Sequence, residues 1–166
     1  MERVVVSGVA YNKNEAKIEI MRIPDVPGVA AKLFKPIADA NIVVDMIIQT
    51  SSTEKGYADV AFTVPKSDFA KTLQLVKENL KEIGGKEVNA DENISKVSIV
   101  GAGMRSHSNV ATQMFSALAR EGINIHMIST SEIKISCIIN AKYTELAVRA
   151  LHDAFELDKP VVTEEK

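Results

Sequence analysis

Alternating or almost wholly apolar stretches predict strands along the first half of the chain. These strands cover residues 4–11, 17–23, 42–50, 57–64 and, as a short edge strand, 86–90. Between them, two segments with apolar residues at helical spacing predict helices at about residues 29–40 and 67–83. Pro36 lies inside the first helix and should distort it, because proline lacks a backbone N–H.

The second half repeats this pattern. It predicts strands at residues 94–100, 123–130 and 134–139, and helices at about 109–121 and 142–156. Placing Gly28 on Asn109 aligns twenty positions without a gap, and seven of them are identical. The identities fall on the apolar side of the helix and on the following strand, so both copies should form the same core.

Each copy has the order β-α-β-β-α-β, which is typical of ferredoxin-like units in an α+β fold. The first copy is complete within residues 17–91, whereas the second, residues 94–158, lacks a final strand. The spare strand at residues 3–11 is therefore predicted to complete the second sheet. This makes two ferredoxin-like units, with the first inserted within the second.

Composition excludes several functions. The 20 basic and 22 acidic residues nearly balance, and the chain has no tryptophan, so no nucleic-acid surface is expected. We expect no membrane span, because no apolar run approaches the necessary length. We also expect no metal, cofactor or catalysis, because the three histidines show no metal-ligand spacing with Cys137, and Cys137 lies in the middle of a predicted strand. Cys137 lies in an apolar run and should be a small buried side chain. We expect a cytoplasmic protein.

The loop between the first two elements of the first copy offers candidate chemistry. Pro24, Pro27 and Gly28 end the strand and leave an exposed helix N-terminus, whose free amides can bind a carboxylate. Asp25 stands beside it and could bind an ammonium group. The alternative is that Asp25 only caps the helix and Gly28 only makes the turn.

At this point the chain resembles a pair of ACT domains, which are small amino-acid sensors, and more closely the regulatory half of aspartokinases. The resemblance rests on five segments in order: residues 20–28, 42–49, 97–104, 122–125 and 128–132. It covers nearly the whole chain, but the amino-acid kinase domain of that family is absent. Either a separate regulatory β subunit or a regulatory fragment would have this form.

The resemblance implies an effector site where two ACT units pair. Asp25 would pair with the effector's ammonium group, and the backbones of Gly28, Val29 and Ala30 would bind its carboxylate. Gln49 would contact the side chain of the effector. Asp45 is a further expected contact, with a surface or interface charge as the alternative role. From the second copy, Asn124 and Ile125 would contribute their backbones.

The second copy has Asn109 in place of Gly28, and no acid in its loop. A second effector could bind there near Met104 and Ser106, or the loop could make a subunit contact. A dinucleotide site at Gly101-Ala102-Gly103 is disfavoured, because Ser106 takes the third glycine position.

The implied function is a non-catalytic regulatory subunit that binds threonine, with lysine as a second candidate, for feedback inhibition of aspartate phosphorylation. Its partners would be a second copy in isolation and the kinase-bearing α subunit. A stand-alone ACT sensor and a structural subunit without an effector are the alternatives.

Overall fold

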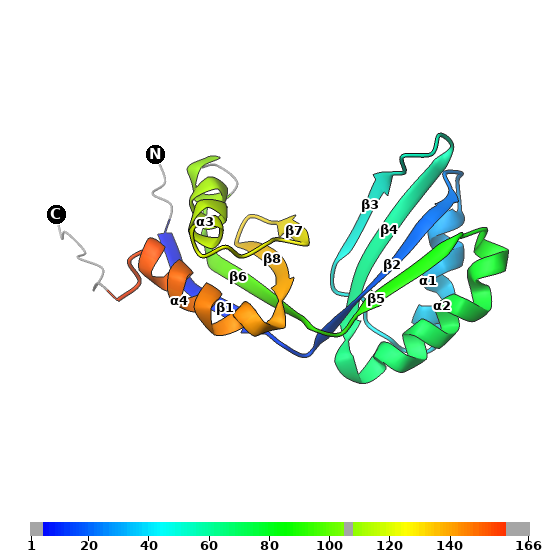
Figure 1. The fold of residues 1–166 in the computed structure, drawn as a ribbon, viewed down its shortest axis with the longest axis horizontal. Helices are drawn as coiled ribbons and strands as arrows, with labels where there is room; N and C mark the ends of the chain where they lie inside the picture. Colours follow the sequence, from blue (N-terminus) through cyan, green and yellow to red (C-terminus); the bar gives the residue numbers. More distant parts are fainter. Residues whose placement is uncertain (1–4, 105–107, 159–166) are drawn as a thin grey trace. The chain divides into compact units, whose positions relative to one another are not determined.

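A computed structural model describes residues 5–104 and 108–158, and the chain forms two units (Figure 1). Residues 14–94 make the first unit, and the chain on either side of it makes the second. The elements of the first unit are β2 (Glu15–Pro24), α1 (Val29–Asp39), β3 (Ile47–Ser51), β4 (Tyr57–Pro65), a 3₁₀ turn (Lys66–Asp68), α2 (Phe69–Ile83) and β5 (Glu87–Asp91). They form an antiparallel sheet of order β3-β4-β2-β5.

The second unit repeats this arrangement with a borrowed strand. Its elements are β1 (Val5–Asn12), β6 (Ile94–Ala102), α3 (Ser108–Arg120), β7 (Met127–Thr130), β8 (Lys134–Asn140), a 3₁₀ turn (Ala141–Tyr143) and α4 (Thr144–Ala154). The sheet order is β1-β6-β8-β7, and β1 lies antiparallel to β6 with Val9 opposite Ile99. β1 therefore takes the place that β5 occupies in the first unit, and the predicted fold class is confirmed.

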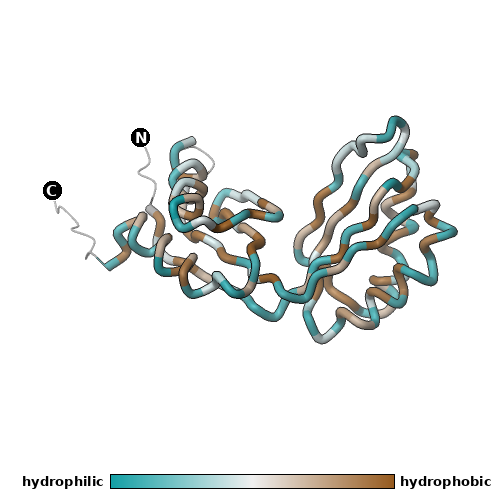
Figure 2. The backbone as a smooth tube through the Cα atoms, viewed as in Figure 1, coloured by the Kyte–Doolittle hydropathy of each residue, from teal (hydrophilic) through white to brown (hydrophobic). Residues whose placement is uncertain are grey.

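Each unit has its own core between one sheet face and two helices. In the first unit, apolar and polar residues alternate along the strands (Figure 2), and Ile18, Ile20 and Phe62 are fully buried. The Phe62 ring meets Phe34 of α1 edge to face, with ring centroids 5.2 Å apart. The core of the second unit includes Ile99, Met114 and Cys137.

Two predicted strands are shorter than expected. The run 42–50 is a strand only at Ile47–Ser51. Just before it the pairing is irregular: the Met46 N–H donates to the Thr63 hydroxyl at 3.1 Å, while the Asp45 N–H donates to the Thr63 carbonyl and the Thr63 N–H to the Met46 carbonyl, both at 3.0 Å. The run 123–130 is a strand only at Met127–Thr130. Ile42 and Ile123 are nevertheless buried, so these two residues are apolar because they pack, although they lie outside the regular strands.

Among the described residues, no helix combines the length and the apolar character that crossing a membrane requires.

Candidate functional site

The loop between β2 and α1 is held by its own backbone. The Asp25 N–H donates to the Gly56 carbonyl at 2.9 Å, and the Val26 N–H donates to the Pro24 carbonyl at 3.0 Å. Gly28 has φ of 89°, in the left-handed region where glycine carries no side-chain penalty. No heavy atom lies within 4 Å of where its Cβ would stand, so Gly28 opens onto free space.

The N-terminus of α1 retains free donors. The first helical bond runs from the Lys32 N–H to the Gly28 carbonyl at 3.1 Å, and the Val29 N–H reaches the Val26 carbonyl at 3.3 Å. Within the described part of the chain, no protein acceptor faces the N–H groups of Gly28, Ala30 and Ala31. These three amides, together with the positive end of the helix dipole, can bind a small anion.

Asp25 does not cap this helix. The N-cap residue is Gly28, no side chain bonds to the cap, and the first turn contains no acidic residue. The Asp25 side chain is exposed. The capping role considered from the sequence is therefore not what the structure shows, and the carboxylate is available to a cation beside the amides. The predicted Val29 contact is the weakest of the set, because its N–H already has an acceptor.

Gln49 shares the sheet face on which α1 packs. It stands opposite Val60, a buried residue of β4, so both side chains point to the helix side. Ser51 pairs with Ala58, and Pro24 pairs with Tyr57, which places the end of β3 and the loop at the same end of the sheet. Gln49 is exposed there.

Asp45 lies outside β3, contrary to the predicted strand, and its N–H donates to the Thr63 carbonyl at 3.0 Å. Asp45 and Gln49 therefore do not belong to one regular strand, and the side-chain alternation of a strand does not place them on the same face. Its carboxylate is exposed. A role in binding stays a prediction that rests on the resemblance alone.

The candidate residues of the second unit have different surroundings. Asn124 is exposed before β7, whereas Ile125 is half-buried against the core of its own unit. Met104 is only 3% exposed, and its N–H donates to the Glu132 carbonyl at 3.0 Å, so it has a packing role. Ser106 lies outside the described residues. A second effector at this loop stays a prediction.

Cys137 is fully buried in β8, as predicted, and burial raises the pKa of its thiol to about 12. The thiol therefore stays protonated at pH 8. We expect native protein to react with a thiol reagent such as dithionitrobenzoate far more slowly than protein unfolded in urea. Fast labelling of the native protein at pH 8 would contradict this placement.

Among the described residues, no group of three His, Cys, Asp or Glu side chains could bind a metal.

Sequence reasoning missed one feature beside the loop. Asp59 of β4 accepts the backbone N–H of Arg22 at 2.8 Å, where β2 carries a bulge. A signal was present, since Ile20 and Ile23 are both apolar but three residues apart, which breaks the two-residue period of a strand.

Comparisons with known proteins agree with this architecture. Two models described as ACT domain match residues 18–83 and 97–155. An aspartokinase of Pseudomonas aeruginosa is 54% identical over 160 residues, which are 96% of this chain and 39% of that protein. An aspartokinase of Helicobacter pylori is 49% identical over 96% of this chain and 38% of its own length. The chain thus spans about two fifths of these relatives.

Two solved structures are close in fold. A structure described as aspartokinase alpha and beta subunits has a TM-score of 0.86 and 51% identity, covering 92% of this chain and 100% of the matched chain. The ligand-free regulatory subunit of aspartate kinase from Thermus thermophilus has a TM-score of 0.85 and 47% identity, covering 90% and 98%.

Proposed function

The chain belongs to the ACT-domain family, as two ACT units that match the regulatory part of aspartokinases, and we propose that it binds threonine as an allosteric effector. The site would be the loop between β2 and α1. Lysine is the second candidate effector. The observation that supports this most is the uncapped N-terminus of α1 beside the exposed Asp25 carboxylate.

The proposed contacts follow the two charges of a free amino acid. The amides of Gly28 and Ala30 bind the α-carboxylate, together with that of Ala31, which the resemblance did not single out. Asp25 pairs with the α-ammonium group. Gln49 then hydrogen-bonds to the side chain of the effector, because its amide can either donate to or accept from a threonine hydroxyl.

The remaining contacts depend on pairing with another ACT unit. Asn124 and Ile125 would supply backbone groups to the effector from such a unit. Asp45 would contribute only if pairing brings its carboxylate toward the ligand. A homodimer in isolation provides this pairing, and so does a hetero-oligomer with a kinase-bearing α subunit.

The proposed output is feedback inhibition of aspartate phosphorylation on the kinase-bearing chain. An effector that binds one packing of the ACT units more tightly shifts the assembly toward that packing. If that packing holds the kinase inactive, binding and inhibition are linked by a coupling free energy on the order of 1–3 kcal/mol. The similarity of this chain to one in a structure described as aspartokinase alpha and beta subunits supports such a partner.

Calorimetry with threonine, lysine, methionine and isoleucine tests the proposal. We expect threonine to bind the wild-type chain, and Asp25→Ala to weaken binding at least about tenfold, because the ammonium group loses a charge-assisted partner. Asp39→Ala is the matched control. Asp39 is exposed near the other end of α1, where it pairs with Lys35, so its loss should leave affinity unchanged.

Other outcomes favour the alternatives. If none of the four amino acids binds at millimolar concentration, a structural subunit without an effector becomes the better hypothesis. If threonine binds but no kinase-bearing chain co-purifies with the protein, a stand-alone ACT sensor is favoured. Equal weakening by the Asp25 and Asp39 variants would show that the loop is not the site.

A further inference from the structure

A β-bulge precedes the effector loop. Ile20 stands opposite Val60 and Ile23 stands opposite Ala58, so β2 uses three steps where β4 uses two. Because of the extra residue, Ile20 and Ile23 both point into the core, where each is fully buried. The same shift brings Asp25 opposite Gly56, whose carbonyl accepts the Asp25 N–H. The register of the loop therefore depends on the bulge.

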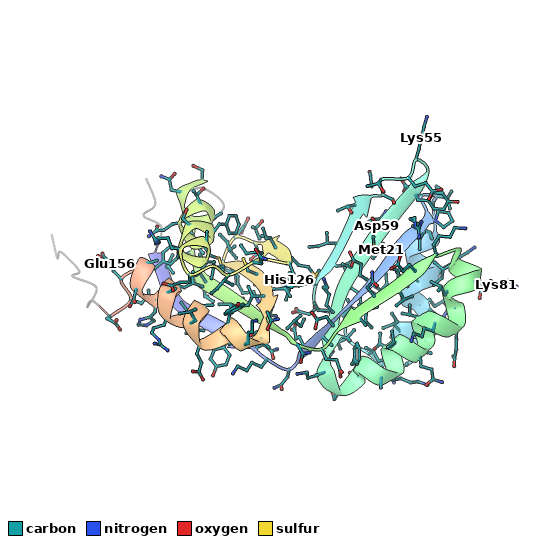
Figure 3. The ribbon with its side chains drawn as sticks, in the orientation of Figure 1. Met21, Lys55, Asp59, Lys81, His126 and Glu156 are labelled. Atoms are coloured by element: carbon teal, nitrogen blue, oxygen red, sulfur yellow. The ribbon has the colours of Figure 1, made fainter. Side chains whose placement is uncertain are left out.

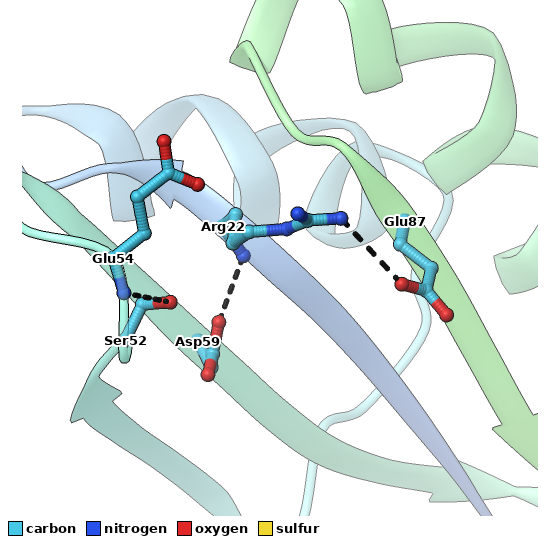
Figure 4. Close-up of polar contacts among 5 residues, drawn as sticks. All are labelled: Arg22, Ser52, Glu54, Asp59 and Glu87. Atoms are coloured by element: carbon cyan, nitrogen blue, oxygen red, sulfur yellow. Dashed lines mark hydrogen bonds and ion pairs between the residues drawn. The ribbon is translucent and has the colours of Figure 1, made fainter.

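The bulge is held by a side chain from the neighbouring strand. The N–H of Arg22 points to the Asp59 carboxylate at 2.8 Å, where a carbonyl of β4 would stand in a regular ladder (Figure 4). Between the two residue pairs that flank the bulge, β2 has two residues, Met21 and Arg22, where β4 has only Asp59 (Met21 and Asp59 are labelled in Figure 3). The Arg22 guanidinium reaches Glu87 of β5 at 3.7 Å, but both side chains are largely exposed, so this pair adds little.

Arg22 adopts a backbone conformation that is unfavourable for an arginine. Its φ is 55°, in the left-handed region that only glycine enters without penalty. The repeat supplies an internal comparison, because extending the alignment backward places Arg22 on Gly103, which has φ of 69°. The next residues, Ile23 and Met104, are both core residues. The two units thus share the conformation, and only the first keeps a side chain there.

We infer that Asp59 is a positioning residue for the effector loop, holding Arg22 in the left-handed conformation that sets the register of Asp25 and the start of α1. This inference rests on the proposed function. The carboxylate touches no effector; it offsets the backbone strain of a non-glycine residue by accepting an N–H that the bulge takes out of the ladder.

The test is rescue by glycine. Asp59→Ala should weaken threonine binding by about tenfold, because the bulge loses a hydrogen bond to a charged acceptor. In the double variant Asp59→Ala/Arg22→Gly, residue 22 needs no such support, and affinity should return to within about twofold of the wild-type value. Asp91→Ala is the matched control, since Asp91 also accepts a backbone N–H, from Asn93 at 2.8 Å, and it lies at the end of β5.

Amide hydrogen exchange separates this inference from the proposed function. The amides of residue 22 and of Asp25 should lose protection in Asp59→Ala, and that of Asp25 should regain it in the double variant. If the wild-type chain binds no amino acid, the proposed function fails, and exchange alone decides the positioning role. Unchanged protection in Asp59→Ala, or a double variant no better than Asp59→Ala, would overturn the inference. If Asp59→Ala does not fold, the double variant must fold for the inference to stand.

Discussion

Residues 95–166 expressed alone are expected to remain unfolded, whereas residues 14–94 are expected to fold as an isolated fragment. The first fragment lacks β1, which pairs with β6 from Val5 opposite Ala102 to Asn12 opposite Lys96. Val6 and Val9 also pack against its core. A unit of this size is only marginally stable, so losing an edge strand and its apolar contacts removes most of that margin.

Circular dichroism and amide spectra of the two fragments check this expectation. The control is a permuted fragment in which residues 1–13 follow residue 158 through a flexible linker, which restores the chain order of a complete ferredoxin-like unit. The permuted fragment should fold. A cooperatively folded 95–166 fragment without β1 would contradict the borrowed-strand arrangement, and an unfolded 14–94 fragment would show that the inserted unit depends on its host.

Phe62→Ala is expected to lower the free energy of unfolding of the 14–94 unit by about 3–5 kcal/mol. The side chain is fully buried, and its ring meets Phe34 edge to face at 75° between planes. Alanine would leave a cavity that neighbouring β-branched residues cannot fill by rotation, and the aromatic contact would also be lost.

The repeat provides a control of smaller volume. Ile47 stands opposite Phe62 and its counterpart Ile128 stands opposite Cys137, so Phe62 and Cys137 occupy equivalent positions. Cys137→Ala removes one sulfur and should cost only about 1–2 kcal/mol. Urea unfolding followed through the amide signals of each unit distinguishes the two. Equal losses would mean that the cores tolerate cavities of different size alike.

Much of the fold follows from apolar periodicity, because the repeat supplies two independent copies of each signal. The pairing of the N-terminal strand with the second sheet was predictable, since the apolar pattern of residues 94–158 predicts only three strands and residues 3–11 supply a spare one. Strand ends were less predictable. Ile42 and Met46 are apolar because they pack in the core, but they precede the regular strand, and the Met46 N–H donates to the Thr63 hydroxyl.

The sequence predicted the loop of the candidate site, but it did not predict the contact between Asp59 and Arg22 that holds the loop in register. Two prolines and Gly28 indicate the turn, and Asp25 is apparent from the sequence. The Asp59 contact joins residues 37 positions apart, and no local pattern specifies it. The left-handed conformation of Arg22 is one that residues other than glycine disfavour, so the identity of residue 22 does not predict it. The conformation follows from the bulge that turns both Ile20 and Ile23 into the core.

The borrowed strand also sets a constraint on biosynthesis. β1 leaves the ribosome before its partner β6, which emerges only after the whole inserted unit has been made. At about 5–20 residues per second, this apolar segment waits on the order of ten seconds. During that interval the nascent chain carries an unsatisfied strand beside a unit able to fold, which makes this segment a target for a chaperone that binds extended apolar peptides.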